Sequence, residues 1–148
     1  MATGKIRLNT DEIKYITLFE TLTGATIKDC IQDEESDSIG FLVKKGDMGL
    51  AIGKNGANIE RVKKAIGKNA WVMEISDDLN EFIKNMFQPT RLKQIRVSET
   101  SSGKVLMLEV SKKDSRKIIG QNGSRIKIAK RLAERHFSVD DIKVKSTY

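Results

Sequence analysis

Residues 47–59 read Asp47-Met-Gly-Leu-Ala-Ile-Gly-Lys-Asn-Gly-Ala-Asn-Ile59. Residues 114–126 repeat this pattern without a gap, as Asp114-Ser-Arg-Lys-Ile-Ile-Gly-Gln-Asn-Gly-Ser-Arg-Ile126. The offset is 67 residues (114 − 47), and six of the aligned positions are identical, including both glycines of each Gly-x-x-Gly. A repeat of that length is too long for a solenoid unit and indicates a duplicated small domain.

The segments before the repeat predict a helix and then a β-hairpin in each copy. Asn9 is a good N-cap with Glu12 at the capping-box position, and Gly24 is a natural helix end. In the second copy Asp77 or Asp78 caps the helix, and the proline at position 89 ends it. The hairpin strands are expected at 26–32 and 38–44, then at 92–98 and 104–110.

After each hairpin, the pattern predicts a short helix, the glycine loop, a longer helix and a final strand. The longer helices are expected to bury Ile59, Val62 and Ile66, or Ile126, Ala129 and Ala133. The final strands are expected at 71–75 and 142–145, parallel to an earlier strand because a helical crossover precedes them. The predicted fold class is α+β, with two tandem domains at 1–76 and 77–148. Each domain runs helix-strand-strand-helix-helix-strand around a three-stranded mixed sheet.

The loops Gly53-Lys54-Asn55-Gly56 and Gly120-Gln121-Asn122-Gly123 are the candidate binding elements. Two glycines at this spacing let the backbone turn sharply and approach a ligand, and the amides at the start of the next helix suit phosphate oxygens. A single copy would be read as a tight turn, whereas two copies in matching context favour a function. A nucleotide-binding P-loop is excluded, because only three residues separate Gly49 from Gly53 and no Ser or Thr follows Lys54.

The charge is concentrated around these loops. Residues 1–76 hold 11 basic and 11 acidic side chains, whereas residues 77–148 hold 16 basic and 9 acidic ones. Residues 44–68 carry seven Lys or Arg against two acids, and residues 112–135 carry nine against two. A basic excess favours polyanion partners, because each phosphate contact releases counterions. The acidic turn at 33–37 is expected to lie away from the bound strand.

The expected RNA-binding residues are the loops, the isoleucines before them and nearby cations. They are Ile52, Gly53, Lys54, Asn55, Gly56, Arg61, Lys117, Ile119, Gly120, Gln121, Asn122, Gly123, Arg125 and Lys127. Ala51 and Ile118 are expected to join the two isoleucines as a surface under the bases. Only eight aromatic residues occur, and four of them, Tyr15, Phe19, Phe82 and Phe87, fall on helical core stripes, which argues against modules that bind by aromatic stacking.

The rest of the inventory gives no catalytic or metal centre. Cys30 and His136 are the single cysteine and the single histidine, so neither a disulfide framework nor a Cys/His metal site is expected. His136 has no predicted acid or nucleophile partner, and no catalytic residue or cofactor is expected. No secretory signal or membrane-length apolar run is found, and a cytoplasmic location is expected.

The segments Ile52-Gly-Lys-Asn-Gly56 and Ile119-Gly-Gln-Asn-Gly123 resemble the core of KH domains. The helix and strand that precede each core resemble the type II arrangement, and the tandem resembles the archaeal NusA-like transcription factors. The resemblance implies that each module binds a few nucleotides of single-stranded RNA, with a role in transcription termination or antitermination. It also suggests the RNA polymerase elongation complex as a partner.

Bacterial NusA proteins also carry an N-terminal polymerase-binding region and an S1 domain. Two KH modules are expected to fill these 148 residues, so contact with the polymerase stays open. Four alternatives also stay open: a ribosome-associated or other KH protein outside transcription, a single-stranded DNA preference, a protein-only scaffold, and an enzyme.

Overall fold

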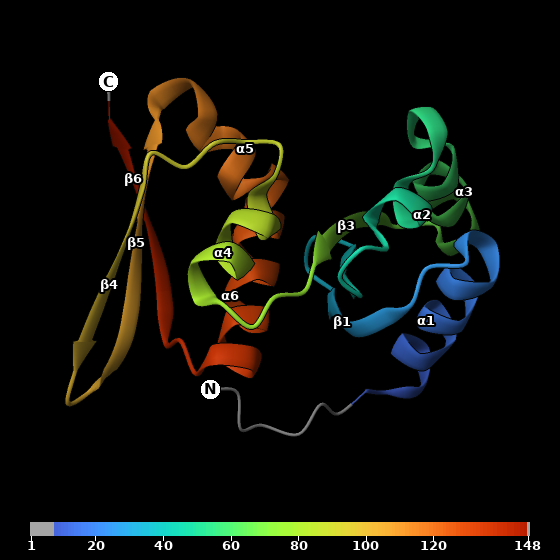
Figure 1. Ribbon diagram of the computed structural model, residues 1–148, viewed down its shortest axis with the longest axis horizontal. Helices are drawn as coiled ribbons and strands as arrows, with labels where there is room; N and C mark the ends of the chain where they lie inside the picture. The colour runs from blue at the N-terminus through green and yellow to red at the C-terminus, as the bar shows by residue number, and fades with distance from the viewer. Residues whose placement is uncertain (1–7, 148) are drawn as a thin grey trace. The chain divides into compact units, whose positions relative to one another are not determined.

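The computed structural model describes residues 8–147, which divide between Ser76 and Asp77 into two compact units. The first unit contains α1 (Thr10–Thr23), β1 (Ile27–Asp33), β2 (Ser38–Val43), α2 (Met48–Ile52), η1 (Lys54–Gly56), α3 (Ala57–Ile66) and β3 (Asn69–Glu74). The second contains α4 (Leu79–Phe87), β4 (Gln94–Thr100), β5 (Gly103–Ser111), η2 (Lys112–Asp114), α5 (Ser115–Ile119), η3 (Gln121–Gly123), α6 (Ser124–Phe137) and β6 (Asp141–Thr147). The predicted element order is therefore confirmed in both copies (Figure 1).

Helix α1 begins with the capping box that its sequence predicts. Asn9 Oδ1 accepts a hydrogen bond from the Glu12 backbone N–H at 2.8 Å, and Glu12 Oε1 accepts one from the Asn9 N–H at 3.1 Å. The other oxygen of Glu12 accepts a hydrogen bond from the Gln32 N–H of β1, at 3.2 Å. The left-handed Gly24 ends the helix. One carboxylate thus fixes both the start of α1 and its position against the sheet.

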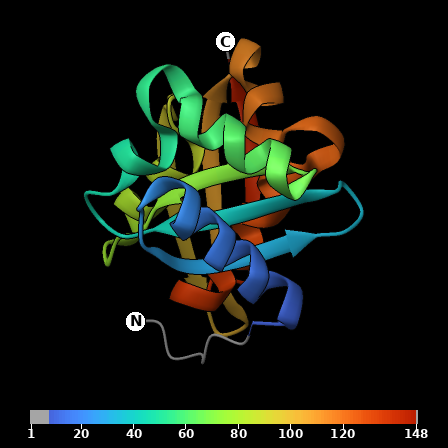
Figure 2. The same ribbon diagram turned by 90° about the vertical axis from the view of Figure 1, so that its right-hand side faces the viewer.

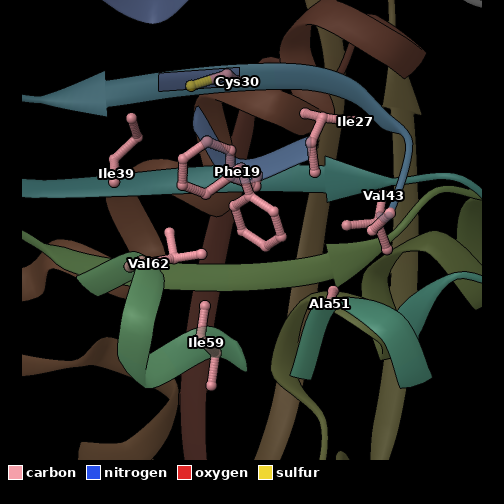
Figure 3. Packing of buried hydrophobic residues seen from close by; sticks show 11 residues of the cluster. Phe19, Ile27, Cys30, Ile39, Val43, Ala51, Ile59 and Val62 are labelled. Carbon is pink, nitrogen blue, oxygen red and sulfur yellow. The ribbon is translucent and has the colours of Figure 1, made fainter. Parts of the chain in front are cut away.

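The sheet of the first unit is mixed, with β2 in the centre. Strand β1 pairs antiparallel with β2, and β3 pairs parallel with it. Helices α1 and α3 lie side by side on one face of this sheet (Figure 2). Between them and the sheet, Phe19 packs against Phe41 with ring centroids 4.6 Å apart, and Val62 is fully buried (Figure 3).

The second unit repeats this topology, with β5 between antiparallel β4 and parallel β6. Of the two candidate caps for α4 it is Asp78 that acts, because its Oδ2 accepts a hydrogen bond from the Glu81 N–H at 2.9 Å. Helices α4, α5 and α6 lie on one side of the sheet in Figure 1. Phe82 and Phe137 join α4 to α6, with ring centroids 4.8 Å apart.

Two expectations for the core are wrong in detail. Ile66 and Ile126 were expected to be buried, and both are only half-buried. Helix α6 begins at Ser124 and turns Arg125 inward, so its buried stripe runs through Arg125, Ile128, Ala129, Leu132 and Ala133. A polar residue therefore occupies the first buried position, which hydrophobic periodicity cannot reveal.

Candidate nucleic-acid interface

The two glycine loops have the same backbone conformation. Gly53 has φ 75° and ψ 174°, and Gly120 has φ 79° and ψ 168°. Asn55 and Asn122 both lie in the left-handed region, with φ of 54° and 56°. Each loop joins a five-residue helix to a longer one, α2 to α3 and α5 to α6. The sequence repeat is thus also a repeat of local structure.

The first glycine of each loop packs tightly against the helix that follows it. A Cβ atom on Gly53 would lie 2.9 Å from the backbone nitrogen of Asn58, and one on Gly120 would lie 2.8 Å from the backbone nitrogen of Arg125. The second glycine has more space, since the nearest atom to a Cβ on Gly56 would be 3.9 Å away. The first position therefore needs glycine for close approach, and the second needs it for its positive φ.

The two central residues of each loop point their side chains into solvent. Lys54, Asn55, Gln121 and Asn122 are all exposed. Within residues 8–147, none of these four side chains has a hydrogen-bond or ion-pair partner. Such side chains can donate hydrogen bonds to a ligand at no cost to the fold, and phosphate and sugar oxygens are suitable acceptors.

The helix that follows each loop adds a second favourable feature for anions. Neither α3 nor α6 has a side-chain cap in the described part of the chain. The backbone N–H groups of an uncapped first turn carry partial positive charge, which favours a phosphate oxygen. Loop and helix start together form a place where a sugar–phosphate backbone could lie.

An apolar surface borders each loop, but it is smaller than the sequence suggested. Ile119 is 40% exposed and Ile52 is half-buried, as expected for contacts with bases. Ala51 and Ile118, in contrast, are fully buried, so their assignment to this surface is wrong. The missed residue is Leu50, which is 49% exposed. It lies three residues before Gly53, and this helical spacing was the available signal.

A polar side chain at equivalent positions ties each loop to the helix in front of it. Asn58 Nδ2 donates to the Leu50 carbonyl at 2.7 Å, and Arg125 Nη1 donates to the Lys117 carbonyl at 3.0 Å. Both donors and both acceptors are related by the offset of 67 residues (125 − 58 and 117 − 50). The contact holds the two helices around the loop in a fixed geometry.

Arg125 also reaches the helix at the start of its unit. Its Nη2 donates to the Gln88 carbonyl at 2.8 Å, and its guanidinium carbon lies 5.5 Å from the centre of the Phe87 ring. The residue is 8% exposed, and burial lowers the pKa of its guanidinium because desolvation penalises the charged form. The sequence singled out Arg125 as a contact to RNA, whereas the structure turns it inward as a support of the loop.

Arg61 makes the corresponding link in the first unit. Its Nη2 donates to the Leu22 carbonyl near the end of α1 at 2.8 Å and to Asn58 Oδ1 at 3.0 Å. In the first unit Asn58 donates to the short helix before the loop and Arg61 to the end of α1, whereas in the second unit Arg125 alone makes both kinds of contact. Arg61 remains exposed, so its outer face is open to solvent.

The other predicted cations lie close to the second loop. Lys127 is half-buried, and its Cε would be 3.7 Å from a Cβ on Gly123. Lys117 is well exposed and forms an ion pair with Asp114 at 3.6 Å. An exposed pair of this kind is weak, so Lys117 can exchange it for a phosphate.

The acidic turn lies at the opposite end of α3 from the first loop. Asp37 forms an ion pair with Lys68, which follows the C-terminal end of α3, and this pairing raises the pKa of Lys68. Helix α3 has ten residues, a length of roughly 15 Å. The turn is thus remote from the loop of its own unit, as expected.

Other kinds of site were also sought in residues 8–147. No group of three or more His, Cys, Asp or Glu side chains is arranged to hold a metal ion there. In the same range, no helix has both the length and the apolar character needed to cross a membrane.

Element order, mixed sheet and the glycine loop between two helices define both units as type II KH modules. A sequence model of the KH domain family matches residues 5–77. The crystal structure of APE1850 is similar over 93% of this chain and 100% of that one, with a TM-score of 0.78 and 35% identity.

Proteins named "Probable transcription termination protein NusA" are similar over nearly the whole chain. The one from Methanococcus vannielii is 41% identical over 95% of this chain and 80% of its own length. The protein from Halococcus morrhuae is 36% identical over 95% of this chain and 99% of its own length. The protein from Methanocaldococcus jannaschii is 35% identical over 95% of this chain and 76% of its own length. The chain belongs to this archaeal NusA family.

Proposed function

We propose that the protein binds single-stranded RNA through both glycine loops and acts as a transcription termination or antitermination factor on nascent RNA. The observation that carries this proposal is the repeated loop, with the same backbone and unpartnered polar side chains in both units. The names of its relatives support the role in termination.

Each loop is proposed to hold about four nucleotides, as KH modules do. Gly53 and Gly120 let the strand approach the backbone, and the central residues of each loop donate to phosphate and sugar oxygens. Ile52 and Ile119 offer an apolar surface to the bases. Arg61 and Arg125 position the loops, since both donate to backbone carbonyls of their own unit.

The remaining assignments follow from this role. The two units are proposed to be the two KH domains, at 1–76 and 77–148. The division between the compact units at Ser76 and Asp77 and the family match at 5–77 support these bounds. We further propose that the protein has no enzymatic activity, that the RNA polymerase elongation complex is its partner, and that it acts in the cytoplasm. The relatives' printed role in transcription supports these assignments.

Adding negative charge to the loops tests the site without disturbing the fold. The double variant Lys54→Glu/Gln121→Glu is expected to bind a single-stranded RNA about 100-fold more weakly, since it loses one contact of roughly 1.4 kcal/mol in each loop. Thermal unfolding should be unchanged, because both side chains are exposed and without partners. Affinity is measured by fluorescence anisotropy with a labelled RNA.

The matched control is Lys14→Glu/Gln94→Glu, which has the same change in charge at two exposed positions outside the loops. It should bind within about threefold of the wild type, the level of long-range effects screened by salt. Equal losses in the two double variants would mean that net charge, rather than the loops, determines RNA binding.

The two modules are expected to contribute unequally to salt dependence. Neutralising Arg116, Lys117 and Lys127 to Gln should lower the slope of log affinity against log salt by about 2, at roughly 0.7 per lost phosphate contact. Neutralising Lys44, Lys45 and Lys54 should lower it by about 0.7, because Lys44 and Lys45 precede α2 and only Lys54 lies at the glycine loop. Titrations at four salt concentrations measure both slopes, and the reverse order would contradict the ranking.

A further inference from the structure

A pocket of about 490 Å³ lies at the C-terminal end of α4, outside the glycine loop of the second unit. It is lined by Lys84, Gln88, Pro89, Thr90, Arg91 and Leu92. Its volume lies within the range of 300–1,000 Å³ that is typical of small-molecule and cofactor sites. None of the residues assigned above to RNA binding lines it.

The chemistry of the lining fits a nucleotide. Lys84 and Arg91 supply two positive charges, and the six lining residues include no carboxylate. Both cations are exposed, and neither has an ion-pair partner among residues 8–147. Pro89 and Leu92 provide apolar surface, while Gln88 and Thr90 can form hydrogen bonds. Cations for a phosphate thus stand beside an apolar wall for a base or sugar.

One residue, Arg125, contacts both the wall of this pocket and the start of the glycine loop. Arg125 donates to the carbonyl of Gln88, in the pocket wall, at 2.8 Å and to that of Lys117, in α5, at 3.0 Å. The same residue lies against Gly120, where an added Cβ would be 2.8 Å from it. The wall of the pocket and the start of the loop therefore both contact one residue, Arg125.

The first unit has no counterpart of this segment. Three residues without charge, Gly24–Thr26, connect α1 to β1. Six residues, Gln88–Lys93, connect α4 to β4. They include two cations, Arg91, which lines the pocket, and Lys93. Since three residues suffice to connect the same two elements, the longer basic connection is an addition particular to the second unit.

We propose that this pocket binds a nucleotide of the same RNA strand that the loop at 120–123 holds, next to the clamped four. Lys84 and Arg91 contact its phosphate, and Pro89 and Leu92 contact its base or sugar. The inference rests on the proposed function of that loop and extends it, so that the second module has a longer RNA site than the first.

The test uses the full chain and two RNAs, of four and of ten nucleotides. Lys84→Ala/Arg91→Ala is expected to bind the ten-nucleotide RNA about 10-fold more weakly and the four-nucleotide RNA within twofold of the wild type. The control Lys143→Ala/Lys145→Ala removes two exposed cations of β6 and should leave both affinities within twofold. Thermal unfolding of both variants verifies that the fold is intact.

Several outcomes would overturn the proposal. Unchanged binding of the longer RNA, or an equal loss for both RNAs, shows that the pocket does not extend the strand's path. Binding of free uridine monophosphate that disappears in the pocket variant assigns the pocket to a free nucleotide instead. Gln121→Glu distinguishes a failure of the pocket proposal from a failure of the proposed function. If it weakens binding of both RNAs while the pocket variant weakens binding of neither, only the pocket proposal fails. If Gln121→Glu also has no effect, the proposed function fails.

Discussion

Gly120→Ala is expected to destabilise the protein by about 4 kcal/mol, whereas Gly123→Ala should cost about 1–2 kcal/mol. The first glycine has φ 79° and ψ 168°, a region of backbone space that is essentially restricted to glycine. A methyl group there would also lie 2.8 Å from the backbone nitrogen and the Cβ of Arg125, so α6 would have to move. Gly123 has φ 73° and ψ 14°, and a Cβ there meets nothing closer than 3.7 Å.

Denaturant unfolding followed by circular dichroism measures both changes. The control is Gly123→Asn, which should cost less than about 1 kcal/mol because asparagine tolerates the left-handed region. Gly53→Ala and Gly56→Ala should show the same ranking in the first unit, where the close contact is with Asn58. Equal costs at the first and second glycine of a loop would show that the contact with the following helix is not limiting.

This expectation determines how RNA binding should be tested. A substitution of Gly53 or Gly120 that abolishes binding has two explanations, a lost RNA contact and a displaced helix. Lys54 and Gln121 avoid the ambiguity, since their side chains are exposed and have no partner in the described chain. The residues that define the motif are thus the ones least suited to probing its function by mutation.

Most of the fold was predictable because its signals are local. The capping box at Asn9, the cap at Asp78 and the glycines at 24, 53 and 120 each depend on a few neighbouring residues. The parallel final strands followed from the helical crossover before them. Strand ends moved by as much as two residues, because pairing with a neighbour rather than propensity determines where a strand ends.

The direction of side chains was less predictable than the elements. Arg61 and Arg125 were singled out for their charge near a loop, and the sequence did not reveal that both donate to backbone carbonyls at the end of a helix distant in sequence. Composition does not report such carbonyls, since every residue carries one. The pocket at 84–92 was not predicted either, because a pocket depends on the path of the chain in space and not on composition.

The repeat offers a way to recover part of this information. Aligned at the offset of 67 residues, Asn58 corresponds to Arg125, and Arg61 to the buried Ile128. A polar residue recurs at the first of these positions, and the structure shows it donating to equivalent carbonyls in both units. Comparing the two copies for conserved polarity, rather than for identity, would have indicated a structural role for Arg125.

That role predicts a large loss of stability for Arg125→Met, about 3 kcal/mol. The substitution keeps most of the side chain's volume but removes both hydrogen bonds to the Lys117 and Gln88 carbonyls, and each hydrogen bond from a charged donor contributes about 1.5 kcal/mol. Arg125→Lys should recover less than half of this, because an ammonium group lacks the planar fork that reaches two acceptors at once.

The control for the stability measurement alone is Arg116→Met, which removes an exposed cation of α5 that has no partner in residues 8–147, and which should change stability by less than about 0.5 kcal/mol. Urea unfolding gives the free energies, and RNA titrations at a temperature where all variants are folded give the affinities. A direct contact between Arg125 and RNA would lower affinity in the lysine variant less than in the methionine variant while leaving stability unchanged. A supporting role predicts instead that stability falls in both variants, and that affinity falls only as far as the glycine loop loses its fixed geometry.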